Sequence, residues 1–213
     1  HEYSLLTQPD LVFTSVTTFI EQFFEGFDSE KIATNLVETH PRYADRTVES
    51  LIAEWAAAGE HGTQVHDEID NWIKNGIEPI ETKAINGKKW LQNYKLKSDI
   101  NVLSEVIVYS TDLKIAGTVD ILALDKTTGR YELIDWKTSK KIETVSYGYK
   151  MGTSRTTDAV MDCNFNHYAL QLSLYRYLLE NYYDIDVHNQ LIAHLQDDGA
   201  RSLVAPYMQD HIV

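Results

Sequence analysis

The stretch from Gly117 to Lys137 constrains the fold more than any other part of this 213-residue chain. It contains two runs that alternate apolar and polar residues, separated at positions 125–129 by residues that favour a tight turn. We therefore predict a β-hairpin. Because residues two apart in a strand point to the same face, Asp135 and Lys137 should project together, and Asp120 on the partner strand can lie opposite them.

This trio of charges has no role in packing an apolar hairpin, because buried charges are costly unless they pair or bind a metal. One interpretation is that Asp120 and Asp135 hold a hard divalent cation while Lys137 faces the same substrate. The alternative is a solvated strand end, where Asp135 and Lys137 form an ordinary ion pair and Asp120 is a surface acid. The spacing by itself favours neither interpretation.

Four short motifs occur in an order that resembles a known family. The motif Gly62-Thr-x-x-His66 comes first, and Gly117-Thr-Val-Asp120, Ile134-Asp-Trp-Lys137 and Gln171-x-x-x-Tyr175 follow. In this order they resemble the PD-(D/E)XK nuclease superfamily. Within it they are most similar to the RecB-like exonuclease branch, which includes the mitochondrial genome maintenance exonuclease and viral and phage relatives. The resemblance covers roughly residues 60–180.

The resemblance implies a restriction-endonuclease-like core, in which a central mixed β-sheet is flanked by helices. We accordingly expect an α/β (mixed α+β) fold with a single nuclease domain over residues 1–213. Residues 1–59 would form an N-terminal helical region, and residues 60–213 would form the nuclease core. The order of elements that the residue patterns predict agrees with this layout.

Hydrophobic periodicity and turn residues predict the elements outside the hairpin. Apart from the hairpin, three strands are expected, at 102–109, 187–195 and 202–207. Helices are expected at 15–24, from Asp28, from Val48 to near Gly59, at 60–75 and at 165–183. Asn86-Gly87 predicts a loop, with a short helix after it that carries Trp90 and Tyr94.

The same resemblance implies a metal site for one or two Mg²⁺ or Mn²⁺ ions. Its implied ligands are His66, Asp120, Asp135, the backbone carbonyl of Trp136 and, on the strand before the hairpin, Glu105. The residues themselves leave the role of His66 open. It shares a helix face with Ile69 and Ile73, and such a face is more typical of a core histidine than of a ligand.

Catalytic and substrate-binding roles also follow from the resemblance. Lys137, Asp120 and Asp135 are the implied catalytic residues. Gln171 and Tyr175 lie four residues apart, so they share one helix face, and in this branch the pair borders the active site. Further substrate contacts are predicted in the polar stretch after the hairpin, at Thr138, Ser139, Lys140, Lys150 and Arg155.

The formal net charge of −13 is unusual for a protein that binds phosphates. Basic residues are nevertheless grouped, with five lysines and no acid at positions 82–98 and a second group at 137–155. These groups predict limited, salt-sensitive DNA binding, and two solvated faces are the alternative. The interleaved Trp90 and Tyr94 could stack on bases or simply pack in the core.

Cysteine usage and hydropathy bear on the cofactor and the compartment. Cys163 is the only cysteine, which excludes an intrachain disulfide and argues against a cysteine-held iron–sulfur cluster. No apolar run is long enough to span a membrane, and the first residues do not resemble a signal peptide. We expect an intracellular protein with no membrane partner, cytoplasmic or nucleoid-associated, including in the host cell of a virus or phage.

Together these features predict a metal-dependent DNA exonuclease that hydrolyses phosphodiester bonds at DNA ends or in single-stranded DNA. Replication, recombination or repair is the implied setting, and a replication or recombination protein is a possible partner. The alternatives are an endonuclease of the same fold, a catalytically silent module that binds nucleic acid or a partner, and an unrelated metal-binding hydrolase. Retention of Asp120, Asp135 and Lys137 argues for activity.

Overall fold

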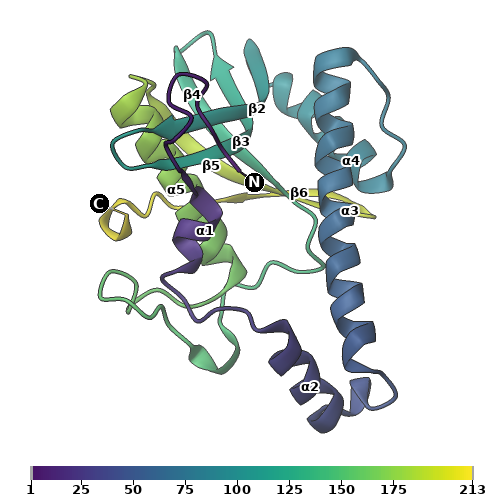
Figure 1. The fold of residues 1–213 in the computed structure, drawn as a ribbon. Coiled ribbons are helices and arrows are strands. Elements are labelled where there is room, and N and C mark those ends of the chain that lie inside the picture. Colours follow the sequence, from purple (N-terminus) through teal and green to yellow (C-terminus); the bar gives the residue numbers. More distant parts are fainter. Residues whose placement is uncertain (1, 213) are drawn as a thin grey trace.

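A computed structural model describes residues 2–212 as one mixed β-sheet with helices on both faces (Figure 1). The strands are β1 (Thr14–Ser15), β2 (Ile100–Ser110), β3 (Ile115–Asp125), β4 (Arg130–Lys137), β5 (Val187–Gln196) and β6 (Gly199–Val204). The helices are α1 (Val16–Glu21), α2 (Ser29–Thr39), α3 (Val48–Asn75), α4 (Thr82–Lys95) and α5 (Asn164–Tyr182). Short 3-10 turns occur at Pro41–Tyr43, Tyr147–Tyr149 and Gln209–His211.

The sheet confirms the predicted hairpin and the mixed α/β fold. β3 pairs antiparallel with β4, with Ile121 opposite Ile134, and β2 pairs along the whole of β3 on its other side. β4 and β5 are parallel, and α5 lies in the crossover between them, as a parallel pair requires. The short β1 runs parallel to the start of β3, and β6 closes the far edge against β5.

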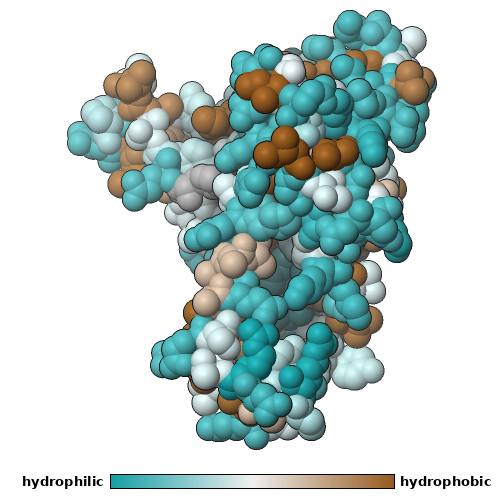
Figure 2. Space-filling view, turned by 90° about the vertical axis from the view of Figure 1, so that its right-hand side faces the viewer, coloured by the Kyte–Doolittle hydropathy of each residue, from teal (hydrophilic) through white to brown (hydrophobic). Residues whose placement is uncertain are grey.

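Two hydrophobic cores lie on the two faces of this sheet. α1 and α5 cover one face, where Leu133 is fully buried, and α3 and α4 cover the other, where Ile134 and Trp136 are buried. Alternation along β4 therefore turns Asp135 and Lys137 towards α5. The outer surface of α3 and α4 is largely hydrophilic, with a few hydrophobic residues scattered over it (Figure 2).

One prediction about helix boundaries is wrong. The helices expected at 48–59 and 60–75 are a single 28-residue helix, α3, which begins at a Thr47 cap and ends at Gly76 in the left-handed conformation. Glycine in a helix interior costs only about 1 kcal/mol relative to alanine, and Gly59 stands among good helix formers. The division proposed at residue 59 therefore falls inside one rigid element.

The predicted loop at Asn86-Gly87 is also wrong, because both residues lie inside α4. The helix begins earlier than expected, at Thr82, and is capped by Glu81, whose side chain accepts a hydrogen bond from the Ala84 amide. A Cβ atom at Gly87 would lie 2.6 Å from Cδ1 of Ile69, so this glycine allows α4 to approach α3 closely. Its role is packing, whereas the sequence pattern indicated a turn.

The last strand starts and ends three residues earlier than predicted. The two-residue turn at Asp197-Asp198 brings Gly199 directly opposite Gln196, so pairing begins at Gly199 and β6 ends at Val204. Gly199 has φ 142°, a conformation that residues with a Cβ atom rarely adopt. Among the described residues, no helix is long and apolar enough to cross a membrane.

Candidate metal centre

The cavity that holds the predicted residues forms where β3 and β4 diverge. Their backbone pairing ends at Ile121 and Ile134, and the next inward residues of the two strands are Asp120 and Asp135. The Trp136 amide donates to Oδ2 of Asp120 at 2.8 Å, so a side chain takes the place of the missing backbone acceptor. A cavity of about 250 Å³ opens beside this point.

Three side chains from three separate elements converge in this cavity. His66 comes from α3, Glu105 from β2 and Asp120 from β3, and one potential ligand atom from each lies within 4.8 Å of the others. Nδ1 of His66 lies 3.5 Å from Oδ1 of Asp120, and its Nε2 lies 3.1 Å from the Trp136 carbonyl oxygen. The face of α3 that carries His66 thus points at the site as expected.

Glu105 lies directly opposite Asp120, where the pairing of β2 with β3 is interrupted. Ser104 pairs with Ile121 and Val106 pairs with Val119, so the register is the same on both sides and the interruption consists of Glu105 and Asp120. Its φ is 49°, in the left-handed region that residues other than glycine rarely enter. Residues held in such a sparsely populated conformation cluster at functional sites.

The charges in the cavity shift one another's protonation. Burial opposes the charge on His66, but the neighbouring Asp120 carboxylate outweighs it and raises the pKa of His66 to about 9. Burial raises the pKa of Glu105 to about 7, with a further contribution from Asp120. Burial acts against the Asp120 carboxylate too, yet His66 outweighs it and lowers the pKa of Asp120. The metal-free site therefore holds an imidazolium where a cation would bind.

Asp135 lines the same cavity beside the three converging groups and is paired with Lys137. Nζ of Lys137 is 2.7 Å from Oδ2 of Asp135, which confirms that the two side chains project together. Burial raises the pKa of Asp135 to about 6 even though the Lys137 charge acts the other way. Burial acts against the Lys137 charge as well, but the Asp135 and Asp120 carboxylates outweigh it and raise the pKa of Lys137, so the ammonium stays charged.

One face of α5 completes this side of the cavity. Nε2 of Gln171 lies 3.4 Å from both Oδ1 of Asp135 and the Tyr175 hydroxyl, to which it donates. Tyr175 packs so tightly on β3 that a Cβ atom at Gly117 would lie 2.5 Å from its ring. The Gln-x-x-x-Tyr pair therefore borders the cavity, and the glycine of the Gly-Thr-Val-Asp motif is required for the packing of α5.

The donor set fits a hard divalent cation. An imidazole and two carboxylates converge, and carboxylate oxygens with an imidazole suit Mg²⁺ or Mn²⁺. Asp135 borders this set, with its Oδ2 paired with the Lys137 ammonium. The Trp136 carbonyl oxygen accepts a hydrogen bond from Nε2 of His66. His66 would have to release a proton to act as a ligand, because only the neutral ring binds metal.

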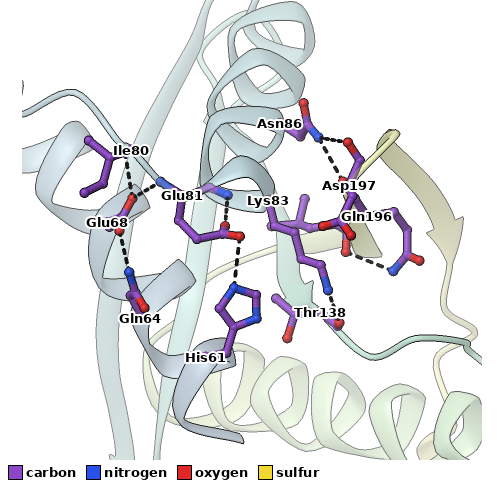
Figure 3. Close-up of polar contacts among 12 residues, drawn as sticks. His61, Gln64, Glu68, Ile80, Glu81, Lys83, Asn86, Thr138, Gln196 and Asp197 are labelled. Carbon is purple, nitrogen blue, oxygen red and sulfur yellow. Dashed lines mark hydrogen bonds and ion pairs between the residues drawn. The ribbon is translucent and has the colours of Figure 1, made fainter. Parts of the chain in front are cut away.

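The strand end after Lys137 is fixed by side chains from α4 and β5. Lys83 donates to the Thr138 carbonyl oxygen at 2.9 Å (Figure 3), and Nε2 of both His194 and Gln196 lie within 2.9 Å of the Ser139 carbonyl oxygen. Thr138 and Ser139 were predicted as substrate contacts. Their backbone is engaged within the fold, and neither residue lines the cavity.

A second set of polar contacts anchors α4 to α3 (Figure 3). Oε2 of Glu68 accepts hydrogen bonds from the amides of Ile80 and Glu81, and His61 lies 2.9 Å from Oε1 of Glu81. Asn86 then links α4 to the β5–β6 turn by donating to the Gln196 carbonyl oxygen at 2.8 Å. The helix that carries Lys83 is thereby held in place from both sides.

The predicted basic contacts lie away from the cavity. Lys140 pairs with Glu54 at 3.1 Å, Lys150 pairs with Glu25 at 2.5 Å, and Arg155 is exposed. None of the three lines the cavity, and their contact with substrate stays a prediction. In the earlier basic segment Lys88 pairs with Glu78, so several of the grouped lysines are already partnered by acids.

Several residues at the cavity have no counterpart among the sequence predictions. Tyr168 lies with its ring centroid 4.6 Å from Nζ of Lys137, and Tyr3, Ser15 and Thr17 line the cavity wall. Tyr168 precedes Gln171 by three residues, so helical spacing could have identified it. Tyr3 lies near Thr118 only through the path of the N-terminal segment, which no local pattern encodes.

Comparisons with known proteins identify no family for this chain. A scan against family models finds no match, and neither does a search of curated proteins. Sixteen chains of solved structures match. One of them, the crystal structure of SSO0001, has a TM-score of 0.38 and 12% identity over 91% of this chain and 66% of that chain. This chain thus spans just under two thirds of that one, and the likeness carries no argument about activity.

Proposed function

We propose that this protein is a metal-dependent deoxyribonuclease that hydrolyses phosphodiester bonds, acting as an exonuclease on DNA ends or single-stranded DNA. The observation that carries the proposal is one shared cavity. It brings the His66, Glu105 and Asp120 cluster together with the Asp135–Lys137 ion pair at the point where β3 and β4 diverge. The order of motifs in the sequence supports the same activity.

His66, Glu105 and Asp120 would hold Mg²⁺ or Mn²⁺, with Asp135 beside them. When bound, such an ion supplies a water molecule of lowered pKa and electrostatic stabilisation of a phosphate oxygen. The described residues around the cluster keep its carboxylates in place. The Trp136 amide orients Asp120, and Gln171 lies close enough to Asp135 to orient it by hydrogen bonding.

Lys137 provides the positive charge that faces the substrate. Its ammonium stays protonated at neutral pH, since the Asp135 and Asp120 carboxylates raise its pKa. A fixed ammonium next to a reacting phosphate offsets the negative charge that builds up there during hydrolysis. We assign Lys137 this electrostatic role, and Asp135 holds it in position.

The charge distribution supports a substrate whose end enters the cavity. The formal net charge is −13, and Lys140, Lys150 and Lys88 are each paired with an acid near the surface. Such a surface offers few free cations to grip a long duplex. We infer salt-sensitive binding and a role inside the cell, where a replication or recombination protein could supply additional DNA affinity.

The test is digestion of end-labelled single-stranded, double-stranded and circular DNA with Mg²⁺, Mn²⁺ or EDTA. We expect metal-dependent loss of linear substrate, intact circles and no cleavage by Lys137→Ala. Cutting of circles would instead identify an endonuclease. If no substrate is cut although Mn²⁺ binds, the protein is a binding module, a possibility that its acidic surface supports.

A further inference from the structure

The ammonium of Lys137 has a second neighbour that the proposed mechanism leaves unused. The Lys137 side chain is only 17% exposed, and its Nζ lies 4.6 Å from the centroid of the Tyr168 ring. This separation is well inside the range of about 6 Å at which an aromatic face attracts a cation. The ring and the Asp135 carboxylate thus both confine the same ammonium.

Confinement matters because lysine is a flexible side chain. Its charge sits at the end of four methylene groups, so it occupies one place only if its surroundings restrict it. Asp135 is one restraint, but this carboxylate also borders the proposed cation site. The Tyr168 ring, in contrast, is assigned no role at the site other than its contact with Lys137.

The position of Tyr168 is itself well determined. It lies on α5 three residues before Gln171 and seven before Tyr175, so all three occupy one face of the helix. Tyr175 is buried against Gly117, Gln171 lies next to Asp135, and the half-buried Tyr168 packs against the core on this side of the sheet. One face of α5 therefore follows the site without a break, from Gly117 on β3 to Lys137 on β4.

We propose that Tyr168 is a positioning residue, whose ring face holds the Lys137 ammonium in the cavity. The role rests on the proposed nuclease function, because it matters only if Lys137 acts on a substrate. The π face of the ring is what the proposal requires, so phenylalanine should replace tyrosine and leucine should not. Both replacements keep an apolar group of suitable size against the core.

The kinetic test compares Tyr168→Leu, Tyr168→Phe and wild type on single-stranded DNA with Mg²⁺. Loss of one restraint on a charged group should lower kcat about 10-fold in the leucine variant, with KM changed less than about 2-fold. The phenylalanine variant should recover most of that loss. Tyr182→Leu, near the end of the same helix and in contact with Tyr177, is the matched control and should leave kcat unchanged.

A second readout does not depend on catalysis. In protein with ¹³C-labelled lysine, the Cε–Hε signal that disappears in Lys137→Arg belongs to Lys137. The ring should shift it upfield in wild type and in Tyr168→Phe, and Tyr168→Leu should return it to the usual range. This measurement remains informative if wild type cuts no DNA, and it is made on variants whose spectra show that they are folded.

Two results would overturn the inference. One is a Lys137 signal that does not move between wild type and Tyr168→Leu, which would show that the ring does not confine the ammonium. The other is an unchanged kcat in Tyr168→Leu despite a shifted signal, which would leave a contact without a positioning role. Failure of the nuclease proposal looks different, because wild type itself would then be inactive while the signal shift persisted.

Discussion

One half of the cavity is assembled from residues far apart in the chain, and the other half largely from local spacings. His66, Glu105 and Asp120 come from a helix and two strands, and the pairing of β2 with β3 is interrupted where Glu105 faces Asp120. In the other half, Asp135 and Lys137 are two residues apart on β4 and face α5, which carries Gln171. The first half gathers ligand atoms, whereas the second fixes a single positive charge.

If this division is correct, substitutions in the two halves should have different signatures. Lys137→Ala should lower kcat by about 1,000-fold, because it removes the ammonium that faces the substrate, yet leave Mn²⁺ binding nearly unchanged. Lys137→Arg should not restore activity, since a planar guanidinium differs from a compact ammonium in reach and shape. Single-turnover kinetics and calorimetric titration with Mn²⁺ measure the two effects. Loss of both together would break the comparison.

Substitutions in the first half should instead weaken metal binding. We expect Asp120→Asn to reduce Mn²⁺ affinity about 100-fold and Glu105→Gln about 10-fold, because His66 and the Trp136 amide both hold the Asp120 carboxylate in place before the metal binds. Calorimetric titration with Mn²⁺ measures the affinity of each variant. The control is Asp112→Asn, which replaces an exposed acid on the β2–β3 turn. Equal losses in the two variants would contradict the ranking.

The metal-free protein should lose stability as the pH rises from 5 to 9. The pKa values of Glu105 and His66 are raised in the folded protein to about 7 and about 9, so the folded state holds protons that the unfolded chain releases. That stabilisation is present at low pH and is lost as the pH passes through these two values. We expect a loss on the order of 3 kcal/mol, measured by urea unfolding in EDTA. His66→Gln should flatten the upper part of the curve.

A smaller effect is expected where α5 meets β3. Gly117→Ala should destabilise the protein by about 2 kcal/mol, because the new methyl group would lie 2.5 Å from the Tyr175 ring. Gly26→Ala is the matched control, since nothing lies within 4 Å of a Cβ atom there. Thermal unfolding of the two variants measures the difference. Equal stabilities would show that α5 can move away from β3 without cost.

The sequence predicts the local half of the site well. The hairpin, the shared face of Asp135 and Lys137, and the Gln171–Tyr175 face all depend on spacings within one element or one turn. Helical spacing from Gln171 would also have identified Tyr168. The mixed sheet flanked by helices is confirmed, whereas the nuclease activity, the bound metal and the DNA substrate stay predictions.

Two of the errors concern glycines that lie inside helices. Gly59 and Gly87 were interpreted as breaks in the chain, but both lie inside helices. Gly87 is required because Ile69 lies against it, and no local pattern shows that contact. The position of Glu105 is similar, since its place opposite Asp120 is fixed by the pairing of Ser104 with Ile121 and of Val106 with Val119. Tertiary contacts therefore decide the features at Gly87 and Glu105, whereas Gly59 is tolerated within a long helix.

The hydrogen bond from the Trp136 amide to Asp120 means that the two oxygens of one carboxylate have different roles. One oxygen continues the hydrogen bonding of the sheet beyond the last paired residues, and the other lies beside His66. The exchange of this single amide proton with solvent should therefore be slow while Asp120 is in place, as if β3 and β4 were still paired. The exchange rate of the Trp136 amide therefore measures whether the Asp120 carboxylate is held in its place in the cavity.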